Sequence, residues 1–197
     1  LERFGAELVY FSPIHDEKLP DNLNGLIFYG GYPELYAEEL SENQSMIQEI
    51  KNAITSGMPY LAECGGFMYL HEFMEDMKGN THSMLGILKG TAYKLSKLAR
   101  FGYIELKSNK TSVLGNEDLF CRGHEFHYFD STSNGTDFVA RKPLTNRSWE
   151  CIHANENGVA GFPHMYYYSN PQMIVDFLKN CENFTSNILL FIFLRQV

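Results

Sequence analysis

No hydrophobic run in this chain of 197 residues is long enough to cross a membrane. The longest covers residues 188–194, whereas a membrane-spanning helix needs about 20 apolar residues. The chain also does not open with the basic and then apolar stretches of a secretory signal. We therefore expect no membrane contact and a cytoplasmic location.

Positive charge is scarce. Lys and Arg number 16 against 24 Asp and Glu, so the formal net charge is -8. Such a surface repels phosphate backbones, which argues against nucleic acid as a partner. Hydrophobic residues make up 44% of the chain and charged residues 20%. These values are ordinary for a globular protein with a buried core, and the length predicts about one domain.

The cysteines form no closely spaced pair. They lie at least 30 residues apart, at Cys64, Cys121, Cys151 and Cys181. This spacing excludes a zinc ribbon and a CxxC redox motif, and it suggests reduced thiols. The open question is whether one of the four is a nucleophile.

Buried strands alternate with helices at the start of the chain. Residues 7–11, 25–29 and 58–62 are β-prone, and 25–29 is continuously apolar, as in a strand buried on both faces. Helical spacing follows over residues 34–40, 45–55 and 66–74. This order predicts an α/β fold with a mostly parallel central sheet flanked by helices.

The second half changes character. Strand-like runs with Gly and Asn punctuation occur between residues 84 and 137, at 103–106 and 124–129. They predict antiparallel strands added to the core sheet, followed by strands at 138–140 and 150–154 and a last helix over 171–179.

Cys64 lies where a buried strand meets a helix, in Ala62-Glu-Cys-Gly-Gly66. Small flanking residues at such a junction are typical of a nucleophile elbow, a tight turn that exposes the reactive side chain. The start of a helix favours the thiolate form, and the N–H of Gly65 can donate to an oxyanion. A buried structural cysteine is the competing interpretation, but this context favours the elbow.

Gly30-Gly31-Tyr32-Pro33 follows the second strand, at the edge where open α/β sheets bind ligands. Its N–H groups could meet an anion or a carbonyl oxygen. A thiolate also needs a base, and His164 lies late in the chain in a loop-like position that suits one. Spacing alone does not choose among the seven histidines.

Arg122-Gly-His-Glu-Phe-His-Tyr128 concentrates polar side chains in a strand-like segment. Alternation predicts Arg122 and His124 on one face and Glu125 and His127 on the other. A metal site would need both histidines and a third ligand, so we expect no metal. A polar sheet surface with an internal ion pair, such as Arg122 with Glu125, is the plainer interpretation.

At these residues the chain resembles the glutaminase domain of the cobyrinic acid a,c-diamide synthase family, within the class I, triad-type glutamine amidotransferases, which have a flavodoxin-like fold. The resemblance runs from about residue 5 to 181. Three ordered motifs carry it, at residues 30–40, 62–70 and 122–128.

The resemblance implies a mechanism. Cys64 attacks the side-chain amide of glutamine, the N–H groups of Gly31 and Gly65 form the oxyanion hole, and His164 activates Cys64 and protonates the departing ammonia. Water then hydrolyses the thioester. In the family, the ammonia reaches a synthetase that uses ATP and Mg²⁺ to amidate the a and c carboxylates of cobyrinate in cobalamin synthesis. This makes the chain part of a carbon–nitrogen ligase.

Two departures from the wider class stand out. Many class I relatives carry a glutamate two residues after the catalytic histidine, where this chain has Tyr166. The cobyrinate branch also lacks it, which leaves a Cys–His dyad. No phosphate-binding GxxxxGK[ST] loop occurs, so we expect the ATP-dependent synthetase to lie outside this chain.

We accordingly expect an amidotransferase domain over residues 1–181, no cofactor within it, and residues 182–197 as a C-terminal extension, in which residues 187–197 are either an added strand or non-native. We further expect Arg122, His124 and Glu125 to face the synthetase. Other interpretations are the glutaminase of a nickel-sirohydrochlorin a,c-diamide synthase, a non-catalytic docking subunit, or another elbow-cysteine hydrolase or sensor.

Overall fold

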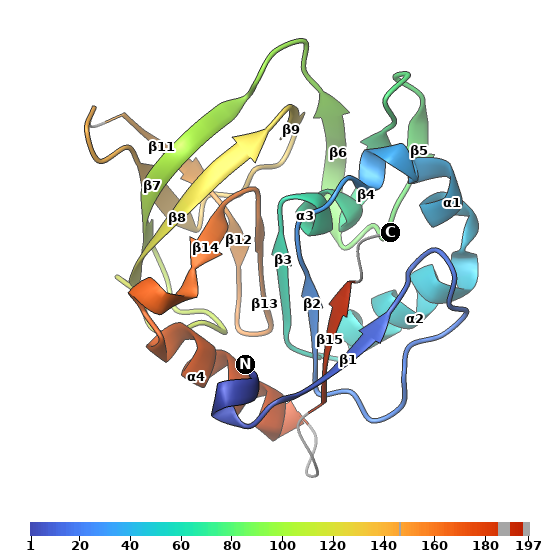
Figure 1. Ribbon diagram of the computed structural model, residues 1–197, viewed down its shortest axis with the longest axis horizontal. Helices are drawn as coiled ribbons and strands as arrows, with labels where there is room; N and C mark the ends of the chain where they lie inside the picture. Colours follow the sequence, from blue (N-terminus) through green and yellow to red (C-terminus); the bar gives the residue numbers. More distant parts are fainter. Residues whose placement is uncertain (146, 185–189, 195–197) are drawn as a thin grey trace.

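A six-stranded sheet forms the centre of the molecule, in the order β1-β15-β2-β3-β13-β12 (Figure 1). The computed structural model describes residues 1–145, 147–184 and 190–194. All neighbouring strands of this sheet are parallel except β12, which runs antiparallel to β13. Its strands are β1 (Glu7–Phe11), β2 (Gly25–Phe28), β3 (Tyr60–Glu63), β12 (His153–Ala154), β13 (Gly158–Gly161) and β15 (Leu190–Leu194).

Two smaller sheets come from the middle of the chain. One is antiparallel, in the order β11-β10-β7-β8-β14, and the other has the order β5-β4-β6-β9. The antiparallel sheet contains β7 (Arg100–Ser108), β8 (Phe120–His127), β10 (Phe138–Arg141), β11 (Ser148–Cys151) and β14 (His164–Tyr166). The other contains β4 (His71–Glu75), β5 (Thr81–Ser83), β6 (Leu88–Lys94) and β9 (Phe129–Ser131).

Helices cover both faces of the central sheet. The helical segments are η1 (Glu2–Phe4), η2 (Pro33–Leu35), α1 (Ala37–Glu42), α2 (Gln44–Thr55), α3 (Gly65–Tyr69), η3 (Tyr167–Ser169) and α4 (Gln172–Phe184). None of those in the described ranges has the length and hydrophobicity to cross a bilayer. The predicted α/β fold with a mostly parallel central sheet is confirmed. The strands predicted between residues 84 and 137 were expected to extend the core sheet, but they belong to the two separate sheets.

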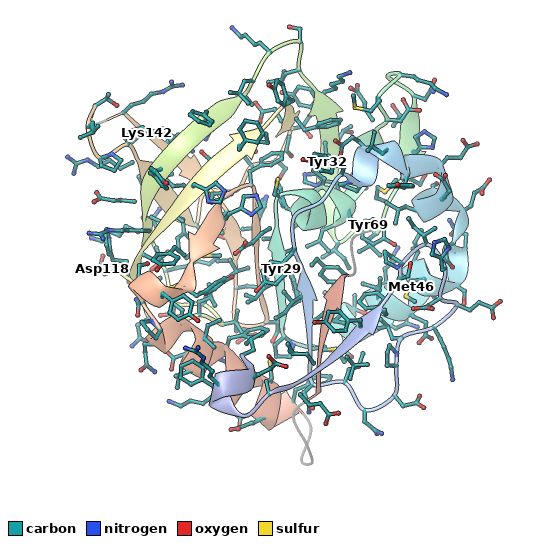
Figure 2. All side chains as sticks on the ribbon, in the orientation of Figure 1. Tyr29, Tyr32, Met46, Tyr69, Asp118 and Lys142 are labelled. Carbon is teal, nitrogen blue, oxygen red and sulfur yellow. The ribbon has the colours of Figure 1, made fainter. Side chains whose placement is uncertain are left out.

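Alternation along β2 divides the core in two. Leu26 and Phe28 pack toward α1 and α2, whereas Ile27 packs toward α4 and the antiparallel sheet. Figure 2 shows the same division, with Met46 of α2 and Tyr29 on opposite sides of β2. A strand buried on both faces must be apolar at every position, which explains the unbroken apolar run at residues 25–29.

The helix predicted over residues 66–74 is wrong in its second half. The structure ends α3 at Tyr69 and begins β4 at His71. The Nδ1 atom of the buried His71 ring lies 2.9 Å from the Phe67 carbonyl oxygen, which a continuing helix would pair with the His71 amide. Leu70 instead closes the helix with a shorter-range bond to Phe67.

Three other predicted limits shift. The helix predicted at residues 34–40 is split into η2 and α1. The strand predicted at 150–154 is broken at Ile152, whose φ is 64°. Within residues 182–197, α4 continues to Phe184, and β15 pairs with both β1 and β2; residues 185–189 and 195–197 lie outside the described residues.

Candidate active site

Cys64 occupies the tight turn between β3 and α3. Its φ of 51° and ψ of −107° lie outside the regions that side-chain-bearing residues ordinarily adopt. The turn is held from both sides, because the Cys64 amide donates to the Gly161 carbonyl at 2.9 Å and the Cys64 carbonyl accepts from the Met68 amide at 3.0 Å. The backbone therefore has the elbow geometry that the sequence predicted.

The glycines after Cys64 are required by close packing. A Cβ at Gly66 would collide with the Phe28 carbonyl oxygen, and a Cβ at Gly65 would lie 2.8 Å from the Gly31 carbonyl oxygen. Elbow and loop thus touch through their backbones. Among the described residues, the amides of Gly31 and Gly65 donate no backbone hydrogen bond, whereas the Gly66 amide donates to Tyr29. The first two are the amides that the sequence analysis assigned to the oxyanion hole.

His164 begins β14 and lies beside Cys64 and Gly30. A Cβ at Gly30 would be 2.7 Å from Cε1 of His164 and 3.7 Å from Cβ of Cys64. Burial alone would lower the pKa of His164, but its interactions with the Cys64 sulfur and the Glu63 carboxylate outweigh burial and raise that pKa to about 10. The two residues predicted as nucleophile and base, far apart in sequence, are therefore neighbours.

The two side chains open into one cavity of about 590 Å³. Besides Cys64 and His164, it is lined by Gly30, Gly31, Glu34, Met68, His124 and aromatic residues of β8 and its continuation. A cavity of this size accommodates an amino-acid side chain and its polar head group. Burial raises the pKa of Glu34, the carboxylate on the wall of this cavity.

Comparisons with known proteins identify the family of this chain. The model of the CobB/CobQ-like glutamine amidotransferase domain matches residues 1–171. The chain belongs to this family. It is 40% identical over 186 residues to the cobyrinate a,c-diamide synthase of Caldanaerobacter subterraneus subsp. tengcongensis, covering 93% of this chain and 41% of that protein. It is 38% identical over 183 residues to the synthase of the same name from Picrophilus torridus, covering 93% and 39%.

Solved structures share the fold at low identity. The structure of PurLQS from Thermotoga maritima aligns with a TM-score of 0.56 and 16% identity, covering 88% of this chain and 96% of that one. A glutamine amidotransferase crystal structure aligns with a TM-score of 0.51 and 16% identity, covering 82% and 80%. The amidotransferase domain described here spans about two-fifths of the length of the curated relatives, since it covers 41% of the first.

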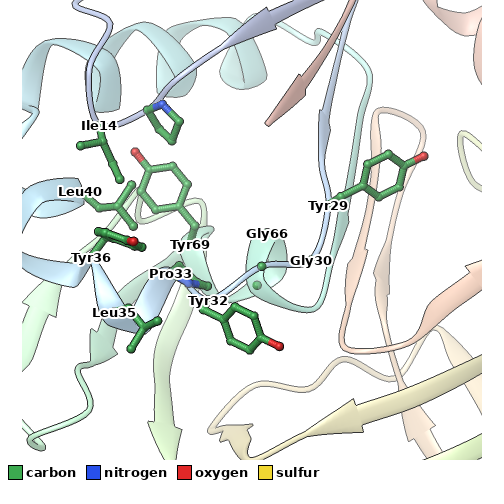
Figure 3. Close-up of a pocket in the computed structure, with 13 residues that line it drawn as sticks. Ile14, Tyr29, Gly30, Tyr32, Pro33, Leu35, Tyr36, Leu40, Gly66 and Tyr69 are labelled. Carbon is green, nitrogen blue, oxygen red and sulfur yellow. The ribbon is translucent and has the colours of Figure 1, made fainter. Parts of the chain in front are cut away.

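The amidotransferase domain has a second cavity, of about 240 Å³, that shares the Gly30–Pro33 loop with the first. Figure 3 shows Tyr69 with its ring toward Ile14 and Leu40, whereas Tyr29 points to the other side of the loop. Neither Cys64 nor His164 lines this smaller cavity. The larger cavity is therefore the candidate active site of the amidotransferase domain.

The segment Arg122–Tyr128 alternates between exposed and buried side chains, as predicted. His124 is on the exposed side, lines the larger cavity and stacks on His164. Glu125 is 1% exposed and faces inward, 4.0 Å from Arg100 and 3.8 Å from His127. The prediction that Glu125 faces a partner is corrected by this burial, and its ion-pair partner is Arg100 rather than Arg122.

Sequence reasoning missed Glu63, which lies 3.7 Å from Nδ1 of His164. The signal was present, because Glu63 is a carboxylate at the end of a strand that is buried at every position. His124 was assigned to partner coupling, and its stacking on His164 was not foreseen. That contact depends on the pairing of β8 with β14, which no local pattern specifies.

Proposed function

We propose that this domain hydrolyses glutamine and supplies the ammonia to the ATP-dependent part of a cobyrinate a,c-diamide synthase in the cytoplasm. The observation that carries the proposal is the position of Cys64 on a strained elbow, beside His164 and at the wall of a common cavity. The names of the relatives favour cobyrinate over nickel sirohydrochlorin as the compound amidated.

The chemistry follows from the neighbours of Cys64. The thiolate adds to the amide carbon of glutamine, and the oxygen that becomes negative is stabilised by the N–H groups of Gly31 and Gly65. The protonated His164 then gives its proton to the leaving nitrogen, which departs as ammonia. Water, deprotonated by the now neutral His164, attacks the thioester, releases glutamate and regenerates the thiolate.

The partner proposal rests on a band of exposed aromatic side chains on the antiparallel sheet. We name it the aromatic face; its members are Phe101, Tyr103, Phe126, Tyr128 and Tyr166, which are between 49% and 82% exposed. Aromatic patches of this kind on a domain surface mark sites of protein contact. Phe126 and Tyr128 also line the Cys64 cavity, so the face begins at the active site.

Arg122 lies in this face, because β14 pairs it with Tyr166. His124, on the same side of β8, is paired with Tyr103 of β7. The curated relatives are more than twice as long as this chain, and the occupant that we propose is their remaining, ATP-dependent part. Mg²⁺ and ATP would be bound there. A partner seated on this face would meet ammonia where it leaves the cavity.

The test uses the isolated chain and a full-length synthase that contains it. The chain should release glutamate from glutamine, and Cys64→Ser should not. In the full-length protein, Arg122→Glu and Tyr103→Ser should spare glutamine hydrolysis and ammonia-dependent amidation but lower glutamine-dependent amidation. Lys78→Glu, at an exposed position between β4 and β5 in a different sheet, serves as the control for a surface charge change. Retained glutamine-dependent amidation in both variants would exclude the aromatic face as the contact.

A further inference from the structure

Glu63 is a buried carboxylate for which the proposed steps have no use. It is the last residue of β3 and 3% exposed, and it directly precedes Cys64. Transferring an ionised carboxylate out of water is costly unless hydrogen bonds and an opposite charge compensate it. Its contacts therefore indicate what keeps it there.

Residues 164–167 give Glu63 two hydrogen-bond donors and an opposite charge. The Tyr167 hydroxyl donates to Oε1 of Glu63 at 2.7 Å, and the Met165 amide donates to the same oxygen at 3.3 Å. The other oxygen, Oε2, lies 3.7 Å from Nδ1 of His164, which is an ion-pair distance rather than a direct hydrogen bond. One oxygen thus fixes the carboxylate, and the other faces the imidazole.

The opposite edge of the imidazole faces the nucleophile. A Cβ added at Gly30 would lie 3.5 Å from Nε2 of His164 and 3.7 Å from Cβ of Cys64. The Nε2 edge of the ring and the Cys64 side chain therefore both border Gly30. A carboxylate beside Nδ1 favours the tautomer with hydrogen on Nδ1, and this leaves Nε2 free to exchange a proton with the thiol. The ring has the same relation to its two neighbours as the histidine of a catalytic triad.

Apart from Cys64 and His164, the titratable groups that interact with Glu63 have pKa values shifted toward their neutral forms. Burial raises the pKa of Tyr29 and of Tyr167 above the ordinary tyrosine value, and it raises the pKa of Cys121 to about 12. Burial, with the nearby positive charge of His164, lowers the pKa of His124. Within the described part of the chain, His164 is therefore the cation that faces Glu63.

We propose that Glu63 is the positioning residue of the catalytic base: it orients His164 and stabilises its protonated form from the strand that carries the nucleophile. Many class I relatives carry a glutamate two residues after the catalytic histidine, where this chain has Tyr166. In this chain Glu63, the residue just before Cys64, takes that role. Tyr167 supports it by holding the carboxylate. The inference rests on the proposed glutaminase function for its consequence in catalysis, but the pairing itself can be measured without it.

The first measurement is the titration of His164, followed by NMR of the chain with isotope-labelled histidine and assigned with His164→Gln. Glu63→Gln keeps the size of the side chain and an oxygen for Tyr167 and Met165, and it removes the charge. We expect the titration midpoint of His164 to fall by about one pH unit, the lower end of the shift that an opposite charge at this distance causes, because Cys64 still faces the ring. Asp137→Asn is the matched control, because it removes the charge of a carboxylate that accepts a backbone amide at 2.7 Å and pairs with Lys110. That variant should leave the midpoint unchanged.

The second measurement is glutamine hydrolysis. Glu63→Gln should lower kcat about 10²–10⁴-fold, the range for a lost general acid–base function, with a much smaller change in KM. Should Glu63→Gln not fold, Tyr167→Phe and Glu63→Asp replace it; both keep the charge but displace it, and both should lower the His164 midpoint by a smaller amount.

An unchanged His164 midpoint and unchanged kcat in folded Glu63→Gln would overturn the inference while leaving the proposed function in place. A wild-type chain that neither hydrolyses glutamine nor reacts at Cys64 with a glutamine-like electrophile would overturn the proposed function instead. In that case, a lowered midpoint in Glu63→Gln would still establish the pairing of Glu63 with His164.

Discussion

The imidazole of His124 stacks on that of His164, with ring centroids 4.8 Å apart and ring planes inclined by 12°. The pairing of β8 with β14 places the two residues directly opposite each other. The strands come this close because residue 123 is glycine, where a Cβ would lie 2.5 Å from the His164 carbonyl oxygen. The proposed base is thus tied to the sheet that presents the aromatic face. Loss of His124 should therefore affect glutamine hydrolysis itself, whereas Arg122 tests partner contact alone.

Cys64 should be the cysteine that a diazo-ketone analogue of glutamine labels. The other three thiols are buried, and burial raises the pKa of Cys121 and of Cys151 to about 12 and also raises that of Cys181. Peptide mass spectrometry after labelling should find the adduct at Cys64, and Cys64→Ala should remain unlabelled. Principal labelling at Cys121, Cys151 or Cys181 would contradict the mechanism.

His164→Gln should lower kcat for glutamine by about 10²–10⁴-fold without preventing folding, because it removes the proton donor for the leaving ammonia. Steady-state release of glutamate measures the loss, and circular dichroism checks the fold. His15→Gln is the control, since His15 is an exposed histidine outside the cavity. Activity of His164→Gln within a few-fold of wild type would exclude His164 as the base.

Gly30→Ala should be more damaging than Gly31→Ala. A Cβ at position 30 would lie 2.7 Å from Cε1 of His164, whereas a Cβ at position 31 meets no described atom within 4 Å. Displacement of the imidazole by a fraction of an ångström weakens proton transfer to the leaving group. The ratio of kcat values for the two variants measures the effect. Equal losses of kcat in the two variants would mean that the loop shifts to accommodate the Cβ at position 30 and that His164 is not displaced.

His71 should make the fold sensitive to acid. Burial lowers the pKa of His71 to about 4, against an unfolded value near 6.5. Between these values the unfolded chain binds the proton and the folded chain does not, so stability falls as pH drops from 6.5 to 4. The slope from this one group is at most about 1.4 kcal/mol per pH unit.

Denaturant unfolding at several pH values measures this slope. In His71→Gln the corresponding component should be absent, even though the variant loses the hydrogen bond that joins His71 to Ser131 at 2.6 Å and is less stable at neutral pH. An identical pH dependence in wild type and variant would show that His71 takes up its proton without unfolding. His15→Gln again provides the exposed control.

The sequence specified those parts of the site that are local. The elbow could be predicted because an apolar strand, a cysteine and two glycines follow one another within residues 60–66. The ion pair of Glu63 with His164 could not be predicted, because its two residues come from distant parts of the chain. Glu63 and Met165, the neighbour of His164, are 102 residues apart. The same limit applies to His124. The helix over residues 66–74 was predicted because the spacing of the apolar residues suits a helix. The contact of the His71 side chain with the Phe67 carbonyl, near which α3 ends, produces no periodic pattern in the sequence.

The pairing of β3 with β13 also has a consequence for how the protein folds. Gly161 lies opposite Glu63 in the register of these strands and accepts the amide of Cys64, and His164 follows three residues later. The reactive site therefore does not exist in any partly folded chain in which only neighbouring segments have come together. Contacts of such long sequence separation form slowly, because closing the intervening loop costs entropy before the contact is made. In a refolding experiment, the reactivity of Cys64 should appear with the last kinetic phase, later than the helical signal of α2.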